Sequence, residues 1–445
     1  MPNATTSRVF LLFVLSLLGW ASVSQAQISL GGQIADSSRL VNVAVVDFAG
    51  QDTQGLSDGA SLSAIIRDDL SGSGLFEVAD QSTYPQSAVQ IDSRPDFNRW
   101  AQTGLDALVS GRVVRSGTKL RVEYRLFDLK QRRALNGFAF TAERRFVREM
   151  AHLIADNAYE VLTGAPGHFS TKIVFVSEEG TATNRVKRLA IMDHDGANFR
   201  YLLPSSSNLN LTPRFSPVSP EITYMSYEDG LPKVYLLNID TLQREVLGEF
   251  AGMTFSPRFT PDGKSVVFSL STNGQSDLYE MDLRTRRQQR LTGDSAIDTS
   301  PSFSPDGRKI VFESDRSGSQ QLYVMNRDGS NVERISFGEG RYASPVWSPD
   351  GRSIAFTRIA GGEFIIGVMD ADGRNERDIT RGFHVEGPSW APNSRMLTYY
   401  KQSPQNADGS GGVARIYVVD IFSGQERLLP TPGGASDPAW SPKIL

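Results

Sequence analysis

The chain has 445 residues, no cysteine and a formal net charge of −4. Without cysteine it can form neither disulfides nor thiolate metal sites, and its slight acidic excess argues against a nucleic-acid partner, which requires a strongly basic face. A chain of this length can bury an ample core and is expected to contain two or three domains.

Residues 1–26 are predicted to be a signal peptide. Arg8 is the only charge before the apolar run Val9–Trp20, and the small residues Ser24 and Ala26 suit cleavage before Gln27. The run is shorter than the roughly 20 apolar residues that span a bilayer. We therefore expect a soluble mature protein outside the cytosol. It begins with a polar segment, residues 27–39, which is either a frayed terminus or a binding peptide.

Residues 40–163 have the mixed pattern of a small α/β domain. Apolar residues at helical spacing predict helices, and continuous or alternating apolar runs predict strands. Helices are expected at Gly59–Leu70, Phe97–Gln102 and Arg144–Leu162. Strands are expected at Leu40–Phe48, Leu75–Val78, Ala107–Val114, Leu120–Phe127 and Ala134–Phe140. Residues 164–170, which contain Gly164, Pro166 and Gly167, are interpreted as a linker.

From residue 171 to 445 a short phrase recurs, typified by PSFSPDG from Pro301. Its anchoring aromatic residues are Phe215, Phe259, Phe303, Trp347, Trp390 and Trp440, which lie 44, 44, 44, 43 and 50 positions apart. A period in the forties with Ser-Pro-Asp-Gly turns is typical of β-sheets repeated around an axis, as in a propeller.

The strand count predicts six blades closed by the C-terminal strand. The apolar strand around Ile173 has no repeat phrase before it, and the phrase at Trp440 has no blade after it. If Pro438–Ser441 supplies the innermost strand of the blade that begins near Ile173, the ring has no free edge.

No motif in the sequence carries catalytic chemistry. There is no G-x-S-x-G, no H-E-x-x-H and no phosphate-binding glycine pattern. The four histidines, His152, His168, His194 and His384, are expected at the surface or as capping residues. We predict no catalytic residue, no cofactor and no metal. Two alternatives stay open: a propeller enzyme of the lactonase or lyase kind, and a peptidase-associated gating propeller.

The segments between one blade's fourth strand and the next blade's first strand are expected to gather at one mouth of the central channel. Met253, Phe255, Tyr342 and Phe383 are expected to be exposed there, mixed with Asp298, Arg341 and Glu386. Aromatic, Met and Arg residues are enriched at protein interfaces, so this mouth is a candidate docking surface. The alternative is that these residues only fill the rim between blades.

An export signal, a small α/β domain and six repeats of the phrase PxFSPDG together resemble the TolB family of the Gram-negative Tol–Pal envelope system. The resemblance covers essentially the whole mature chain. It implies a non-enzymatic periplasmic protein without a cofactor, a monomer within a larger envelope complex. It also implies binding of the lipoprotein Pal at one propeller mouth and of the inner-membrane protein TolA by the mature N-terminus, in support of outer-membrane integrity and division.

The resemblance also assigns candidate binding residues. The phrase Asp298-Thr299-Ser300-Pro301 matches the family's element at the Pal-facing mouth, with Thr299 the leading candidate. The candidate Pal-binding residues are Met253, Phe255, Ser256, Asp298, Thr299, Ser300, Arg341, Tyr342, His384 and Glu386. The candidate TolA-binding residues are Gln27, Ile28, Ser29 and Leu30. We hypothesise that binding at the mouth biases whether residues 27–38 dock on the propeller body or reach their partner.

Overall fold

The computed structural model describes residues 40–91, 94–181, 184–204, 209–228, 230, 232–248, 252–404 and 412–443. The chain divides into two compact units between Phe169 and Ser170. The predicted signal peptide and the candidate residues Gln27, Ile28, Ser29 and Leu30 lie outside the described residues. In the described part, no helix is both long enough and apolar enough to cross a bilayer.

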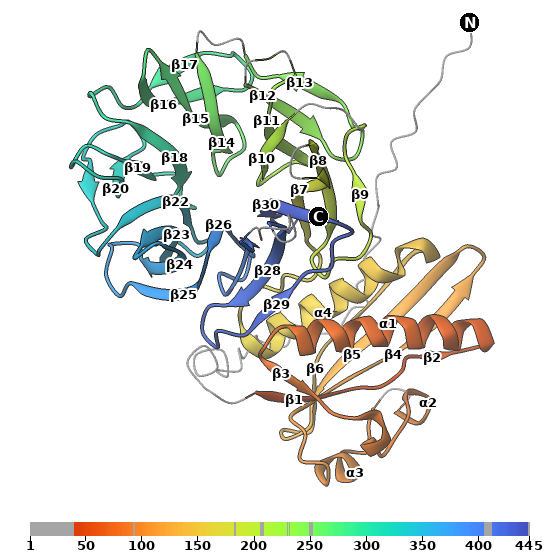
Figure 1. The fold of residues 1–445 in the computed structure, drawn as a ribbon. Coiled ribbons are helices and arrows are strands. Elements are labelled where there is room, and N and C mark those ends of the chain that lie inside the picture. The colour runs from red at the N-terminus through yellow and green to blue at the C-terminus, as the bar shows by residue number, and fades with distance from the viewer. Residues whose placement is uncertain are drawn as a thin grey trace, which may run out of the picture. The chain divides into compact units, whose positions relative to one another are not determined.

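The first unit is an α/β domain built on one sheet of order β3-β1-β4-β5-β6, with β2 paired to β4 (Figure 1). Strand β1 runs parallel to β3 and β4, and β4, β5 and β6 form an antiparallel meander. The strands are β1 Val41–Val45, β2 Ala49–Gly50, β3 Phe76–Val78, β4 Ala107–Ser116, β5 Lys119–Asp128 and β6 Arg133–Glu143. The helices are α1 Thr53–Gly72, α2 Ala88–Ile91, α3 Phe97–Ala101 and α4 Val147–Thr163, with short 3-10 turns at Gln81–Thr83 and Arg144–Phe146.

Helices α1 and α4 bury their apolar sides on one sheet face, and α2 and α3 pack on the other. Helix α1 begins at Thr53, six residues before the predicted Gly59, because the Asp52 carboxylate caps it by accepting from Gly55 N at 2.6 Å. Three of the four histidines were wrongly expected at the surface, because His152, His168 and His194 are all buried. His152 lies in α4 with Nδ1 2.7 Å from Asp69 Oδ2 of α1.

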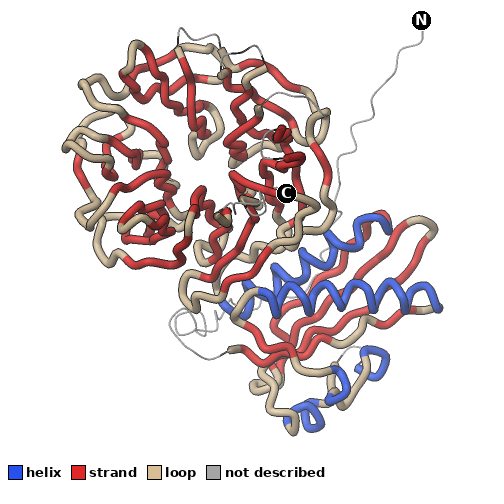
Figure 2. Tube along the Cα trace, in the orientation of Figure 1, coloured by secondary structure: helices blue, strands red, loops and turns tan. Residues whose placement is uncertain are grey.

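The second unit is a six-bladed propeller, as predicted (Figure 2). Each blade is a four-stranded antiparallel sheet, and the first strand of each blade lies nearest the centre (Figure 1). The innermost strands are β10 Asn210–Phe215, β14 Met253–Phe259, β18 Asp298–Phe303, β22 Arg341–Trp347, β26 His384–Trp390 and β30 Gly434–Trp440. The second strands are β11 Glu221–Ser226, β15 Ser265–Thr272, β19 Lys309–Ser314, β23 Ser353–Ala360, β27 Met396–Gln402 and β7 Lys172–Thr181.

The outer half of each blade consists of a third and a fourth strand. The third strands are β12 Lys233–Asn238, β16 Gln275–Asp282, β20 Gln321–Asn326, β24 Glu363–Asp370, β28 Ala414–Asp420 and β8 Asn184–Asp193. The fourth strands are β13 Arg244–Val246, β17 Gln288–Arg290, β21 Glu333–Arg334, β25 Arg377–Gly382, β29 Glu426–Leu428 and β9 Arg200–Tyr201. The apolar side chains of neighbouring blades pack against each other, which explains the nearly continuous apolar runs of the inner strands.

The ring closes as the sequence predicts. Strand β30 pairs antiparallel with β7, with Trp440 opposite Ile173, in the sheet order β30-β7-β8-β9. The Trp440 indole Nε1 donates to Thr171 Oγ1 at 2.7 Å. The last described strand therefore supplies the missing innermost strand of the blade that β7 begins.

Every innermost strand has a bulge at the residue before the proline of its repeat phrase. The pairing register shifts there in all six blades. The bulged residues have positive φ: Thr212 (49°), Ser256 (48°), Ser300 (53°), Ser344 (50°), Gly387 (70°) and Asp437 (50°). Positive φ is unusual for the five that are not glycine, and a bulge of this kind bends the strand locally.

Candidate docking surface at the propeller mouth

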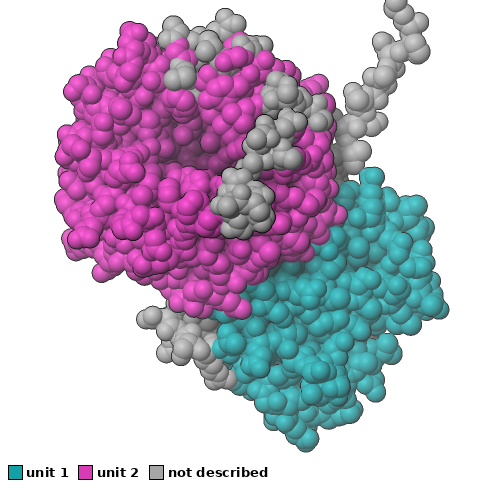
Figure 3. All heavy atoms as spheres, viewed as in Figure 1, with its two compact units in different colours: residues 1–169 teal, residues 170–445 magenta. Residues whose placement is uncertain are grey.

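The starts of the innermost strands and the segments before them lie at one end of the propeller, whose centre is hollowed (Figure 3). Three large apolar side chains in these segments are exposed: Ile297 (46%), Phe337 (73%) and Phe383 (59%). They precede β18, β22 and β26, which are neighbouring innermost strands. Their position keeps this mouth a candidate protein-binding surface.

Thr299, the leading candidate, is held by a buried carboxylate. Its hydroxyl donates to Glu313 Oε1 on β19, and the backbone N–H of Ser344 in the next blade donates to Glu313 Oε2 at 2.8 Å. Glu313 is only 7% exposed, and this burial raises the pKa of its carboxyl despite the hydrogen bonds that oppose the shift. Glu313 thus fixes two neighbouring bulges of the mouth.

Asp298 was expected at the surface, and this expectation is wrong. Asp298 is fully buried and both its carboxylate oxygens accept from Arg316 Nη2 at 3.0 Å. The same guanidinium lies 3.2 Å from Asp294 and stacks near the rings of Phe312 and Tyr323. Asp298 therefore stabilises the blade from inside.

Tyr342 was likewise expected to be exposed, and it is fully buried. Its hydroxyl lies 2.9 Å from both carboxylate oxygens of Glu376, to which it donates. Burial and the hydrogen bond to Glu376 raise the pKa of Tyr342 to about 12. The ring packs on Phe356 with centroids 5.2 Å apart, so Tyr342 fills the space between blades.

His384 and Glu386 belong to a partly buried polar cluster. The His384 ring lies between Phe364 and Tyr400, with centroid distances of 4.7 and 5.4 Å. His384 Nε2 is 3.3 Å from Glu386 Oε2, and the Tyr400 hydroxyl donates to the same oxygen at 3.1 Å. His384 Nδ1 is 3.2 Å from Gln402 Oε1. The side chains of His384 and Glu386 remain partly exposed at the mouth.

The remaining candidates lie at the starts of β14, β18 and β22. Phe255, Ser256 and Ser300 are half-buried, and Arg341 is exposed with no hydrogen bond or ion pair to any described residue. Met253 begins β14, and its side chain lies outside what the structure describes. All ten candidates thus belong to four neighbouring innermost strands.

Sequence reasoning omitted three residues that matter at this mouth. Ile297 and Phe337 are exposed, but each precedes its strand by one or more residues and was not selected as a site residue. Glu313 lies on a second strand, KIVFES, where an acidic residue amid apolar neighbours was the only available signal.

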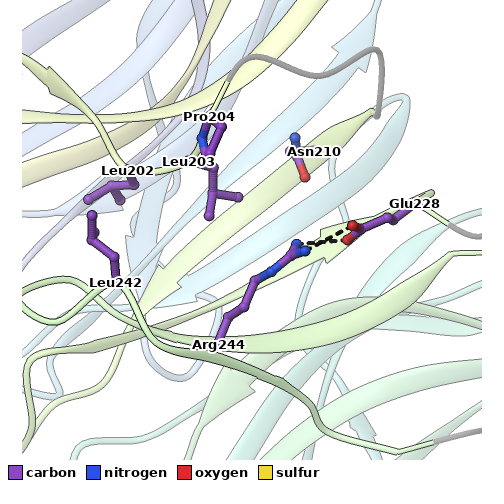
Figure 4. A pocket seen from close by; sticks show the side chains of 7 residues that line it. All are labelled: Leu202, Leu203, Pro204, Asn210, Glu228, Leu242 and Arg244. Atoms are coloured by element: carbon purple, nitrogen blue, oxygen red, sulfur yellow. Dashed lines mark hydrogen bonds and ion pairs between the residues drawn. The ribbon is translucent and has the colours of Figure 1, made fainter. Parts of the chain in front are cut away.

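A separate cleft of about 430 Å³ lies beside β10, lined by Leu202, Leu203, Pro204, Asn210, Glu228, Leu242 and Arg244 (Figure 4). Its two charged residues point at each other, with Arg244 Nη1 and Nη2 2.7 and 2.8 Å from the two Glu228 oxygens. A guanidinium already held by both oxygens of one carboxylate offers no acid–base pair for catalysis.

An α/β domain joined to a six-bladed propeller, with a mouth suited to a protein partner, defines an interaction scaffold. A family model described as the TolB beta propeller domain matches residues 159–444, and one described as the TolB amino-terminal domain matches residues 34–135. The chain belongs to the TolB family of the Tol–Pal system.

Individual relatives are similar to this chain over most or all of its length. A "Tol-Pal system protein TolB" from Paramagnetospirillum magneticum is 57% identical over 447 residues, covering 100% of this chain and 99% of the relative. Another from Pelagibacter ubique is 59% identical over 383 residues, covering 86% of each. The crystal structure of TolB from Acinetobacter baumannii has a TM-score of 0.80 and 30% identity, covering 91% of this chain and 97% of that one.

Family membership decides between the classes that the sequence left open. The chain is a non-enzymatic protein of the Tol–Pal envelope system, not a propeller lactonase or lyase and not a gating propeller of a peptidase.

Proposed function

We propose that this protein works in the periplasm as an adaptor that binds the lipoprotein Pal at the propeller mouth and TolA through its mature N-terminus. In this role it maintains outer-membrane integrity and supports envelope constriction during division. Membership of the Tol–Pal family supports the proposal at the level of the system. The predicted signal peptide, residues 1–26, supports export to the periplasm.

The observation that carries the Pal proposal is the row of exposed apolar side chains Ile297, Phe337 and Phe383 on neighbouring segments of one mouth. Burying such side chains in a partner is the main favourable contribution to protein association. Exposed Arg341 and half-buried Thr299 supply polar groups among them. Buried Asp298 and Tyr342 then act indirectly, by holding the strands that present this surface.

The TolA proposal rests on residues 27–39, a polar segment at the mature N-terminus that contains Gln27, Ile28, Ser29 and Leu30. A segment of this composition can adopt an extended conformation on a partner and pays the ordering entropy only on binding. The sequence and the family resemblance support this part of the proposal.

Calorimetric titration of the mature chain with the periplasmic domain of Pal tests the mouth. Phe383→Ala should weaken binding by about 2 kcal/mol, roughly 30-fold, because truncating an exposed aromatic anchor removes apolar contact area. The matched control is Phe422→Ala. Phe422 is also 59% exposed but lies in the turn between the third and fourth strands, at the opposite end of its blade.

If neither substitution weakens binding, Pal binds elsewhere on the molecule. Loss of Pal binding in both variants would instead indicate damage to the fold, which circular dichroism and thermal unfolding of each variant would reveal.

A further inference from the structure

Two arginines occupy the same repeat position on neighbouring innermost strands. Arg214 on β10 and Arg258 on β14 each directly follow the proline of the bulge. The four equivalent residues in the other blades are Ser302, Val346, Ser389 and Ala439, none of which carries a charge. The ring around the channel therefore has two adjacent cations at this level and no carboxylate at the same repeat position.

The equivalent serines show which way this position faces. Ser302 Oγ accepts from Trp347 N of the next innermost strand at 3.2 Å, and Ser389 Oγ accepts from Trp440 N at 3.0 Å. The position after the proline thus faces the innermost strand that follows it. By the same register, Arg214 faces β14, the strand that bears Arg258.

Neither guanidinium is hydrogen-bonded to a carboxylate in the described part of the chain. Both side chains are partly buried, and neither makes an ion pair with any described residue. Arg214 Nη1 donates to its own neighbour, Pro213 O, at 2.7 Å. The charge of Asp437 on β30, on the other side from β14, raises the pKa of Arg214 against the larger effect of burial. Burial lowers the pKa of both arginines, and the charge of Arg214 lowers that of Arg258 further.

Two partly buried guanidinium groups of like charge on neighbouring innermost strands, neither in an ion pair with a described residue, are a favourable setting for an oxyanion. We propose that Arg214 and Arg258 form a binding site for one phosphate-like or carboxylate oxyanion in the wall of the propeller channel. The anion accepts hydrogen bonds from both guanidinium groups and offsets their mutual repulsion. It comes either from solution, as inorganic phosphate, or from a carboxylate of a bound partner.

The first experiment titrates the mature chain with inorganic phosphate by calorimetry in a Tris buffer of low ionic strength. We expect saturable binding with one site, weakened about tenfold or more in Arg214→Gln and in Arg258→Gln, because each loses charge-assisted hydrogen bonds. The matched control is Arg308→Gln, since the Arg308 side chain is 85% exposed on a Ser-Pro-Asp-Gly turn at the other end of the strand. It should bind phosphate as the wild type does.

Thermal unfolding without phosphate gives a second readout. Removing one of two repelling charges should leave the melting temperature of Arg258→Gln unchanged or raised, whereas a purely structural arginine would lower it on loss. If Arg258→Gln does not fold, Arg258→Lys keeps the charge but loses the planar fork, and it should bind phosphate more weakly.

A third arm separates the sources of the anion. If phosphate competes with the periplasmic domain of Pal, the partner supplies the carboxylate; if phosphate leaves that affinity unchanged, the site takes a free ion. This arm depends on the proposed function, but the phosphate titration does not. The site is refuted if the wild type binds no phosphate at millimolar concentration, or if both glutamine variants bind it as tightly as Arg308→Gln.

Discussion

At the scale of the residue, neighbouring side chains in the segments at the mouth differ in burial: some pack inside the blades and others are exposed. Asp298 and Tyr342 turn into the blade interface, while their neighbours Ile297 and Arg341 turn outward. The sequence shows a polar and aromatic mixture in both segments but not which member faces the next blade. That assignment depends on the bulges at Ser300 and Ser344, which shift the pairing register by tertiary packing.

The contribution of a buried carboxylate to stability can be measured at Arg316, which contacts one buried and one exposed carboxylate. Asp298→Ala should lower the free energy of unfolding by about 3–5 kcal/mol, because it leaves a partly buried guanidinium without its main partner. Asp294→Ala, which removes a carboxylate whose side chain is 49% exposed, should cost about 0–1 kcal/mol. Urea unfolding of the two variants compares them directly, and equal losses would contradict an internal role for Asp298.

At the scale of the element, the sequence period predicted the repeated blades. It did not predict the start of α1, which depends on local contacts. The six aromatic anchors predicted the blades. The strand at Ile173 without a preceding phrase and the phrase at Trp440 without a following blade predicted the closure. The start of α1 was missed because Gly55 and Gly59 lower helix propensity. In the structure a Cβ at Gly59 would lie 2.1 Å from Phe48 O, so the glycine is needed for the close approach of α1 to the sheet. A packing requirement of this kind leaves no pattern in the sequence.

The closing strand should be distinguishable from the other five innermost strands. Trp440→Ala should destabilise the propeller by about 3–5 kcal/mol through lost packing, and it should speed amide hydrogen exchange in β7, whose inner edge β30 covers. Trp347→Ala is the matched control, because Trp347 is the equivalent residue of an internal blade, 9% exposed against 5% for Trp440. It should speed exchange in β23 instead. Unchanged exchange in β7 after Trp440→Ala would argue against closure by this strand.

At the scale of the whole molecule, the proposed function has two binding regions on one chain: residues 27–38 at the mature N-terminus and the mouth of the propeller. Fold and family were predictable because they depend on the order of domains and on repeats spread along the chain. The candidate site was predictable only as a set of neighbouring segments. Which side chains a partner meets depends on exposure, and Phe337 and Glu313 show how exposure and burial depart from residue type.

If the two regions are coupled, deleting residues 27–38 must change the affinity for Pal. Coupling between sites is typically about 1–3 kcal/mol, so we expect a change of roughly 5- to 150-fold in the dissociation constant measured by calorimetry. Linkage is reciprocal: saturation with Pal must alter the affinity for TolA by a factor set by the same coupling free energy. A chain lacking residues 27–38 that binds Pal as the intact mature chain does would show that the two regions act independently. In that case the protein would be a passive bridge between its partners, and only the separate affinities would determine how often both are bound.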